Sequence, residues 1–598
     1  MNKTFKAYFY AISLVMRKAP GYGLLAIIDS VLRSLSNLAF NLILLGLITD
    51  SVIQGRNFVE TLPFVLVVGG AMLLSGIVKH IKSDYFRETT KNKITEHINA
   101  LILEKSISLD IARYEDSEFY ETFYLIVKNA DQKVFDIFDE SIEIIALIIS
   151  LAGTVTILWS ISAVYLVFCI CALLINGITM ISRNRLRYSY DINMTKRRKR
   201  SEYFNRIFYL PEYIKEIKIN NLSTIYKEKN KANYADMLSL AQRFGKRIAV
   251  LGLIVQFIAD SVLIDGLLFA KMSYDVLVLK TLSVGNVITI LRGVSNLQWT
   301  VSDLIDKGSH VAINTKYIGK MLEFLALNSQ LSCGESIPEV TTESMIEFKN
   351  VSFCYLEGGR QILNDVNMKI HLGEKTAIVG LNGAGKSTLF KLLLRFYDPT
   401  KGSILLDGTD IKQFDLVAYR RLFSCVFQDF NIYAASVEEN IAMDSEFCSE
   451  EIIAAGDELN IGSVLDRYGL TYASHLGKEL YEDGVDLSGG EKQKIAIARI
   501  FTAQNAKVFL LDEPTSYLDA KSDFDTMHAI SNNLSGKGMV IISHHLPNIT
   551  DSAQINVMED GRVIEQGTHS ELMALDGEYA TMYKVQAKRY MREEYNEQ

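Results

Sequence analysis

Residues 377–388 read AIVGLNGAGKST. Gly380, Gly385, Lys386 and Ser387 fall on the G-x-x-x-x-G-K-[ST] spacing of a phosphate-binding loop. Glycines let backbone N–H groups close around an anion, Lys386 can reach the outer phosphates of a nucleotide, and the Ser387 hydroxyl can ligate Mg²⁺. A β-prone run precedes the loop and a helical pattern follows it, so a helix dipole favours phosphate here and a bare glycine-rich turn is the weaker reading. The predicted nucleotide contacts of the loop are Asn382, Gly383, Ala384, Gly385, Lys386, Ser387 and Thr388.

The composition of the chain predicts a membrane part joined to a soluble part. Its 598 residues are 49% hydrophobic and 22% charged, and a mean hydropathy of +0.13 is high for a soluble protein. The net charge of −8 does not favour nucleic acid as a partner. Six cysteines form no C-x-x-C pair, which indicates neither zinc nor a disulfide framework. The polar N-terminus and the long first apolar run argue against a cleavable signal peptide.

The first half of the chain contains six segments that approach or exceed the roughly 20 residues needed to span a bilayer. The sixth segment is polar for a span, with Asn286, Arg292, Asn296 and Gln298, and an amphipathic soluble helix is the alternative. We interpret it as a span, because an odd number would place the nucleotide site outside the cell. We therefore predict a helical transmembrane domain over residues 1–327, with spans near 21–48, 62–82, 137–159, 161–182, 248–270 and 284–305.

Basic residues predict the orientation of these spans in the cell membrane. The segment after the fourth span is rich in Arg and Lys, whereas the expected outer loops hold only Arg56, Lys271 and Lys280. By the positive-inside rule, 83–136, 183–247 and both termini are cytoplasmic. A basic run beside a span favours contact with anionic membrane lipid over nucleic acid. The basic residues are Arg183, Arg185, Arg187, Lys196, Arg197, Arg198, Lys199 and Arg200.

Both cytoplasmic segments have helical patterns, so the spans are expected to continue as long helices below the membrane. Their tips lie near 110–117 and 210–216, where turn-prone or aromatic residues interrupt the pattern. Such tips could dock on the nucleotide-binding part, or they could be ordinary solvent-exposed hairpins. A polar linker is predicted over 328–344, and an α/β P-loop ATPase domain over 345–598, where β-rich runs alternate with helices.

Further candidate residues of this domain stand at the ends of predicted strands. Four apolar residues precede Asp512 and Glu513, which fits a buried parallel strand that presents acids at its ligand-binding edge. Asp512 can hold the Mg²⁺ shell, and Glu513 can polarise an attacking water. Tyr355, at the end of a strand-like run, can stack on adenine, although a core tyrosine is the commoner reading. Gln428 and His544 end two other β-prone runs and could equally be satisfied polar residues.

The sequence Leu-Ser-Gly-Gly-Glu at 487–491 precedes a helical run. Its small residues and free N–H groups form a second predicted anion site, and a plain helix N-cap is the alternative. Together with Tyr355, the phosphate loop, Gln428, the strand and acids at 508–513, Ser-Tyr-Leu-Asp at 516–519 and His544, this element resembles the ATP-binding cassette (ABC) proteins. Six spans ahead of one cassette resemble an exporter-type half-transporter, over essentially the whole chain.

This resemblance implies a head-to-tail dimer, either a homodimer or a heterodimer with a second half-transporter. In that family Ser488, Gly489 and Gly490 of one cassette would close on ATP held by the other. The resemblance assigns Gln428 to Mg²⁺ and coupling, His544 to the γ-phosphate, and Asp519 to a link between the two sites. It would also make the cytoplasmic tips coupling helices. Tyr517, His545 and Glu491-Lys492 depart from the family pattern, but none removes a catalytic group, so we expect a competent ATPase that uses ATP and Mg²⁺.

The substrate is expected to be hydrophilic. Polar residues recur every four positions in three spans, and such spacing places them on one helix face. Charges inside a bilayer cost about 2.5–3.5 kcal/mol on insertion scales, so they favour a wet cavity; internal pairing of Asp29 with Arg33 is the alternative. The stretches around Gln428 and 484–490 also resemble exporters of modified peptides and bacteriocins. The predicted cavity residues are Asp29, Arg33, Asn37, Asn41, Gln256, Asp260, Arg292 and Asn296.

ATP-driven export, of a hydrophilic peptide, is the function that the sequence favours. A lipid or drug exporter, an importer on the exporter fold, and an ATP-gated channel or regulator are the alternatives. The intact Glu513 argues against a gate, because a gate need not turn over rapidly. A pathway for lipid or greasy drugs would favour aromatic and aliphatic lining residues over charged ones.

Overall fold

The computed structural model describes residues 3–55, 58–329, 331–355, 359–443, 448–478 and 480–596. The chain forms two compact units. The helical unit comprises Met1–Ser108 and Ser117–Leu327, and the cassette unit comprises Leu109–Asp116 and Asn328–Gln598. The predicted domain bounds of 1–327, 328–344 and 345–598 stay predictions, and Leu109–Asp116 pack with the cassette unit.

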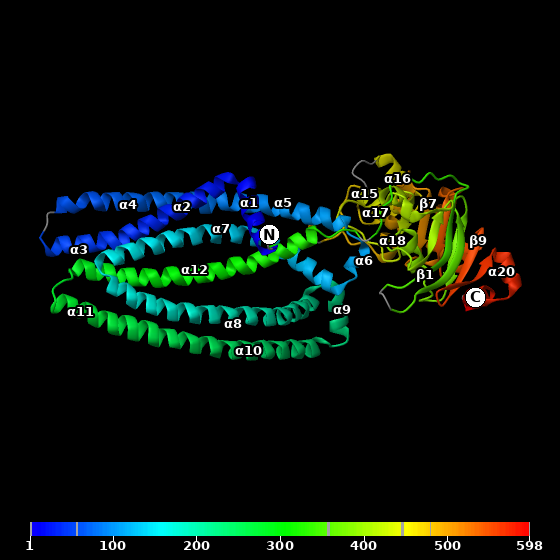
Figure 1. The fold of residues 1–598 in the computed structure, drawn as a ribbon. Coiled ribbons are helices and arrows are strands. Elements are labelled where there is room, and N and C mark those ends of the chain that lie inside the picture. Colours follow the sequence, from blue (N-terminus) through cyan, green and yellow to red (C-terminus); the bar gives the residue numbers. More distant parts are fainter. Residues whose placement is uncertain are drawn as a thin grey trace. The chain divides into compact units, whose positions relative to one another are not determined.

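The helical unit is built from long helices that run alongside one another (Figure 1). Helices α7 and α12 lie side by side over much of their length, and α8 pairs with the helix formed by α10 and η3. Close packing of α7 on α12 uses glycine: a Cβ at Gly293 would lie 2.8 Å from a Leu158 methyl carbon. The elements are α1 (Lys3–Lys18), α2 (Pro20–Leu38), η1 (Ala39–Leu44), α3 (Leu45–Ile53), α4 (Phe58–His80), η2 (Ile81–Phe86), α5 (Arg87–Ser108), α7 (Ser117–Ile161), α8 (Ala163–Tyr209), α9 (Pro211–Ile219), α10 (Ser223–Ile254), η3 (Val255–Leu268), α11 (Phe269–Leu277) and α12 (Val284–Leu325).

Five helical stretches of the described chain are long and apolar enough to cross a membrane. Four of them contain the predicted spans near 21–48, 62–82, 137–159 and 248–270, and Ala163–Tyr209 covers all but the first two residues of the predicted span 161–182. The sixth predicted span lies in α12, which falls outside this set and stays a prediction; polar side chains such as Arg292, Asn296 and Asp303 interrupt its apolar run. The five stretches are Pro20–Ile53, Val59–Ser108, Ala130–Ile161, Ala163–Tyr209 and Ser223–Leu277.

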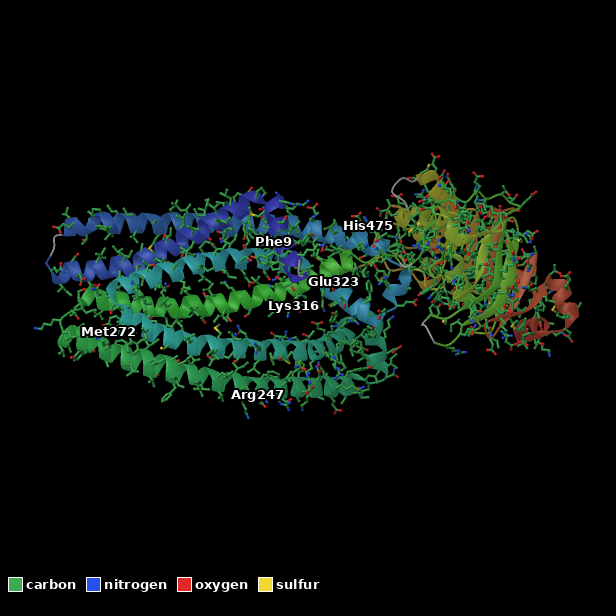
Figure 2. The ribbon with its side chains drawn as sticks, viewed as in Figure 1. Phe9, Arg247, Met272, Lys316, Glu323 and His475 are labelled. Atoms are coloured by element: carbon green, nitrogen blue, oxygen red, sulfur yellow. The ribbon has the colours of Figure 1, made fainter. Side chains whose placement is uncertain are left out.

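Side chains along the helical unit separate into apolar and basic regions. Helix α4 exposes Phe64, Val67 and Leu73, which suits a surface that faces lipid. Along the continuous helix from α10 to α11, Arg247 lies toward the α9 end and Met272 lies near the opposite end (Figure 2). Arg247 therefore lies in the part of the helix that is expected to be cytoplasmic.

The cassette unit contains a mainly parallel six-stranded sheet in the order β10-β9-β3-β8-β7-β6 and an antiparallel four-stranded sheet in the order β2-β1-β4-β5. The strands are β1 (Met345–Phe353), β2 (Leu363–His371), β3 (Lys375–Gly380), β4 (Lys401–Leu406), β5 (Thr409–Asp410), β6 (Phe423–Val426), β7 (Val508–Asp512), β8 (Gly538–Ile542), β9 (Gln554–Glu559) and β10 (Arg562–Gly567).

The central strands are mostly apolar and are covered by helices (Figure 1). Strands β7 and β8 are buried at every residue, and β3 carries its carboxyl end straight into the phosphate loop. The helical elements are α6 (Ile111–Tyr114), α13 (Lys386–Leu393), η4 (Ile411–Gln413), α14 (Leu416–Arg420), α15 (Val437–Ala442), α16 (Ser449–Asp457), α17 (Ile461–Arg467), α18 (Gly489–Thr502), α19 (Ala520–Asn533), η5 (Leu546–Ile549), α20 (His569–Leu575) and α21 (Glu578–Asn596).

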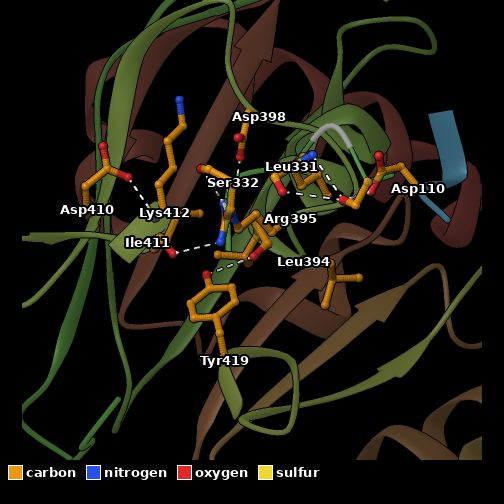
Figure 3. A network of polar contacts seen from close by, with 12 residues as sticks. Asp110, Leu331, Ser332, Leu394, Arg395, Asp398, Asp410, Ile411, Lys412 and Tyr419 are labelled. Carbon is orange, nitrogen blue, oxygen red and sulfur yellow. Dashed lines mark hydrogen bonds and ion pairs between the residues drawn. The ribbon is translucent and has the colours of Figure 1, made fainter. Parts of the chain in front are cut away.

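The segment Leu109–Asp116, which holds α6, is attached to the cassette by charged and polar contacts. Lys391 forms an ion pair with Glu115 at 3.1 Å, and the Ser329 hydroxyl donates to Asp110 at 2.6 Å. Next to it, the buried Arg395 guanidinium donates to the Ile411 carbonyl and contacts Asp398, at 3.2 Å in each case, and donates to the Ser332 carbonyl (Figure 3). The first predicted cytoplasmic tip is thus tied to the start of the linker and to the cassette core.

Candidate functional site

The phosphate loop has the backbone geometry that its glycines predict. Gly383 and Gly385 have φ of +84° and +101°, values that L side chains rarely adopt. A Cβ at Gly380 would lie 2.2 Å from the Met558 carbonyl oxygen, so the end of β3 also requires glycine. Lys386 begins α13, and its ammonium donates to the Gly380 and Leu381 carbonyl oxygens at 2.8 and 3.1 Å. The lysine charge is therefore held over the loop, where an anion would bind.

A cleft of about 840 Å³ opens at this loop. Tyr355 lines it, as predicted for an adenine-stacking ring, and the Tyr355 hydroxyl lies 3.1 Å from the Thr388 hydroxyl. Ala384 is buried beneath the loop and does not line the cleft. The lining residues are Tyr355, Arg360, Gln361, Ile362, Asn382, Gly383, Gly385, Lys386, Ser387, Thr388, Gln428, Glu513, His544, Asp560 and Gly561.

Five of these lining residues were missed by sequence reasoning. Arg360, Gln361 and Ile362 lead into β2, and Asp560 with Gly561 forms the turn between β9 and β10. The backbone N–H of Asn364 donates to the Gly561 carbonyl oxygen at 2.8 Å, and this bond brings the two segments together. The Asp-Gly pair signals a tight turn, but nothing local in the sequence says that this turn meets the phosphate loop.

Glu513 lies at the centre of the catalytic candidates. It follows β7 with a φ of +50°, a backbone conformation that is uncommon outside glycine. One carboxylate oxygen accepts from Gln428 Nε2 at 2.9 Å, and the other lies 2.9 Å from His544 Nε2. The ends of β6, β7 and β8 thus bring together three of the predicted site residues at one edge of the sheet.

Burial shifts the acid–base properties of the groups around Glu513. It lowers the pKa of His544, with a further contribution from the nearby Lys386 charge, and it also lowers the pKa of Lys386. Burial raises the pKa of Asp512 to about 6. The Oδ1 atom of Asp512 is buried and has no hydrogen-bond partner among the described residues, while the Ser387 hydroxyl is bonded to the same carboxylate. An oxygen-preferring cation would satisfy this orphaned atom.

The second predicted anion site lies at the start of α18. The Ser488 hydroxyl caps the helix by accepting from the Glu491 N–H, and the Glu491 carboxylate accepts from the Ser488 N–H at 2.8 Å. A Cβ at Gly490 would lie 2.9 Å from the Tyr517 carbonyl oxygen, so this position has little room for a side chain. Gln493, further along α18, donates to the Glu513 carbonyl oxygen at 3.3 Å and accepts from the Tyr517 N–H at 3.0 Å.

The signature residues and the phosphate loop do not share a cleft within one chain. Ser488, Gly489 and Gly490 are absent from the described residues that line the nucleotide cleft. Asp519 stands at the N-cap position of α19 and is not among the described residues that line the cleft; hydrogen bonding to Ser522 lowers its pKa. Among the departures from the family pattern, Tyr517 is 61% exposed beside Gly489, and His545 contacts Asp523 at 3.0 Å. Neither departure touches the Glu513 carboxylate.

The helical unit contains a polar cavity of about 310 Å³ between α2, α7 and α12. Arg33, Asn37 and Asn296, three of the predicted substrate residues, line it. Arg33 and Lys307 both pair with Glu143, the former at 3.8 Å. The lining residues are Ser30, Arg33, Ser34, Asn37, Glu143, Ala146, Leu147, Ser150, Asn296, Trp299, Thr300, Asp303 and Lys307.

Four other predicted substrate residues, Asp29, Asn41, Gln256 and Arg292, do not line this cavity. Asp29 is fully buried and pairs with Lys82 at 2.6 Å and with Arg33 at 3.7 Å, so the alternative of internal pairing applies to it. Asn41 falls in η1, a π-helical stretch that changes the rotation per residue and moves it off the stripe. Gln256 and Arg292 are exposed elsewhere on η3 and α12. Asp260 lies in η3, but its side chain falls outside the described residues.

Comparison with known proteins agrees with this architecture. The family model for the ABC transporter matches residues 363–516. The cassette of this chain belongs to the ABC transporter family. The chain is a multi-pass membrane protein in which this cassette follows the helical unit along the chain. Its fold is that of a bacterial Atm1-family ABC exporter with ATP bound, with a TM-score of 0.76, 23% identity, and coverage of 96% of this chain and 99% of that one.

The relatives of this chain are described as transporters of different substrates. It is 34% identical over 307 residues to the putative multidrug export protein YgaD of Bacillus subtilis, covering 51% of this chain and 52% of that one. It is 27% identical to the subtilin transport protein SpaT of Bacillus subtilis, with coverage of 84% and 82%. It is 29% identical to the lipid A-core flippase of Legionella pneumophila, with coverage of 89% and 88%. The matched part of the chain spans about half the length of YgaD.

Proposed function

We propose that this chain is one half of a dimeric exporter that uses ATP hydrolysis to move a hydrophilic substrate, a peptide, out of the cell. The observation that carries this proposal is the Glu513 carboxylate, held between Gln428 and His544 at the edge of the phosphate-loop cleft. The same chain carries a helical membrane unit with a polar cavity. Its partner is a second copy of the chain or a different half-transporter in the cell membrane, with both cassettes in the cytoplasm.

Hydrolysis requires a base for water and a counter-charge for the phosphates. Glu513 takes the first role, because its carboxylate faces the cleft and can polarise a water for attack on the γ-phosphate. Lys386 supplies positive charge at the loop, and His544 orients Glu513 and the γ-phosphate. Ser387 and Asp512 are the residues that would hold Mg²⁺, and Gln428 would complete its surroundings. When bound, Mg²⁺ would neutralise charge on the phosphates.

We infer a composite ATP site, formed by two chains, because the described lining of the cleft lacks the Ser488–Gly490 signature of its own chain. ATP in this cleft would have no contact with the Ser488–Gly490 signature of the same chain, because those residues are not among its described lining. A second cassette placed head to tail would supply Ser488, the free N–H groups of α18 and the nearby Asp519 to that ATP. ATP binding would then join the two chains, and hydrolysis would release them.

The cavity supports a hydrophilic substrate over a lipid. Arg33, Glu143 and Lys307 are charged residues that already pair with one another or with Asp29. Asp303 lines the same cavity and forms no hydrogen bond or ion pair with any described residue. One turn away, the Trp299 ring is 72% exposed and also lines the cavity. A free carboxylate beside an indole ring suits a positively charged group, such as a lysine side chain or an amino terminus of a peptide.

The relatives leave the substrate open between a peptide, a lipid and a drug. SpaT is a subtilin transport protein, and it matches this chain over most of its length; the lipid A-core flippase matches over a similar span. An unpaired Asp303 favours the peptide, since desolvating this carboxylate against a greasy substrate would be costly.

The experiment that tests this function uses purified chain in proteoliposomes with the cassettes outside. A mixture of short peptides that differ only in charge is added with Mg-ATP, and the lumen is analysed by mass spectrometry. We expect ATP-dependent accumulation of cationic peptides over neutral and acidic ones. In Asp303→Asn this preference should fall by about tenfold while ATP turnover persists. Uptake that is equal for every charge would contradict the cationic substrate, and ATP-dependent flipping of a labelled lipid without peptide uptake would contradict a hydrophilic one.

A further inference from the structure

The C-terminal helix contacts the backbone that carries His544. Gln586 of α21 donates from Nε2 to the His544 carbonyl oxygen at 2.6 Å. Its Oε1 accepts from the Leu546 N–H at 3.0 Å. One side-chain amide therefore bonds both the carbonyl of His544 and the N–H of Leu546, two residues further on, as the backbone of a neighbouring strand would.

Helix α21 is itself fixed to the cassette, so this bracket has a firm base. The Glu565 carboxylate of β10 accepts from the Glu578 and Tyr579 N–H groups at 2.6 and 3.1 Å and thereby caps the helix. Tyr579 is completely buried, and its hydroxyl lies 2.8 Å from His569 Nδ1 in α20. A Cβ at Gly577 would lie 2.1 Å from the Glu565 carboxylate, so the residue that precedes α21 has no room for a side chain unless Glu565 moves.

Other hydrogen bonds of residues 543–548 involve the residues on either side of His544, whereas the His544 carbonyl oxygen is bonded to Gln586. Ser543 accepts from the His545 N–H at 2.9 Å. The His545 ring contacts Asp523 at 3.0 Å, and Asn548 donates to the same carboxylate at 2.9 Å. At His544 the side chain points to Glu513, and the carbonyl oxygen points to Gln586.

We propose that Gln586 is a positioning residue for ATP hydrolysis: it sets the place of the His544 ring relative to Glu513 and so makes the C-terminal helix part of the catalytic apparatus. The inference rests on the proposed ATPase function of the cleft. Displacing α21 would move the His544 carbonyl, loosen the ring from Glu513 and slow hydrolysis, although α21 contributes no residue to the described lining of the cleft.

The test compares three variants of the full chain. Gln586→Ala removes both hydrogen bonds, and Gln586→Glu keeps the acceptor for Leu546 but loses the donor to His544. Val585→Ala is the matched control, because Val585 is the preceding residue of α21 and is 55% exposed. We expect kcat to fall by about tenfold in both Gln586 variants, with KM for ATP within about twofold of wild type. The control should keep wild-type kcat.

Two further readouts separate positioning from general stability. In a His544→Ala background, Gln586→Ala should change the residual rate by less than about twofold, because the two residues act as one unit. Hydrogen exchange of peptides covering 540–550 should accelerate in Gln586→Ala and stay unchanged in Val585→Ala. The inference is overturned if exchange in this segment is unchanged, or if Gln586→Ala lowers the rate equally with and without His544. Hydrogen exchange can be measured without ATP hydrolysis. An inactive wild-type protein would therefore contradict the proposed ATPase function and would leave the exchange test of Gln586 valid.

Discussion

His544 Nε2 lies 2.9 Å from the Glu513 carboxylate. The opposite carboxylate oxygen accepts from Gln428 at 2.9 Å, so neighbouring strand ends hold this acid from both sides. A carboxylate that is fixed in this way needs no rearrangement before it polarises a water, which is the basis of electrostatic preorganisation.

Glu513→Gln should lower ATP hydrolysis by at least about 100-fold, because the amide keeps the shape and loses the base. ATP binding should persist, and the variant should accumulate as a closed dimer in the presence of ATP. Turnover is measured by phosphate release, and binding by a fluorescent nucleotide. Glu458→Gln, an exposed acid at the end of α16, is the matched control and should behave as wild type. Rapid hydrolysis by Glu513→Gln would show that another group acts as the base.

Replacing Asn37 with Leu should reduce substrate-stimulated ATPase by about fivefold while basal ATPase stays near wild type, because an exposed amide is removed from the cavity lining. Asn296→Leu should have the same direction, with an added loss of stability, since Asn296 donates to Thr154 at 2.7 Å. Gln256→Leu, exposed on η3 and outside the cavity, is the control. Equal stimulation in Asn37→Leu and wild type, across the peptide mixture, would argue against this cavity as the substrate site.

His545 should stabilise the cassette in a pH-dependent manner. Its hydrogen bond to Asp523 raises its pKa above the ordinary value, so its stabilisation is fully present below the unfolded-state pKa of about 6.5 and is lost as pH rises through the folded-state pKa. His545→Gln should therefore lower Tm more at pH 6 than at pH 8.5. His371→Gln, an exposed histidine at the end of β2, should show no such dependence. A larger loss at pH 8.5 would have the wrong sign for this contact.

The local patterns of the cassette predict its fold and most of its site. Glycine spacing at the phosphate loop and apolar runs that end in Asp512, Glu513, Gln428 and His544 mark strand ends, and parallel strands bring such ends to one edge of a sheet. Asp560 and Gly561 could not be predicted, because their proximity to the loop depends on how β9 and β10 pair with the rest of the sheet.

The helical unit was less predictable from its sequence. A four-residue repeat assumes a regular α-helix, and the π-helical stretch η1 breaks this assumption between Asn37 and Asn41. Charges also find partners on other helices: Asp29 pairs with Lys82, which lies 53 positions away. The docking of Leu109–Asp116 on the cassette depends on single contacts such as Glu115 with Lys391, which carry no signature in the sequence.

The composite ATP site is the central claim, and mixed dimers test it most directly. One chain carries Lys386→Ala and the other carries Ser488→Arg, with different affinity tags so that only mixed dimers are purified. If each site combines the phosphate loop of one chain with the signature of the other, both lesions fall in one site, and the intact site should retain up to about half of wild-type hydrolysis. Each doubled parent should be nearly inactive. Mixed dimers that are as inactive as both parents would contradict the account, because each lesion would then have disabled the site of its own chain.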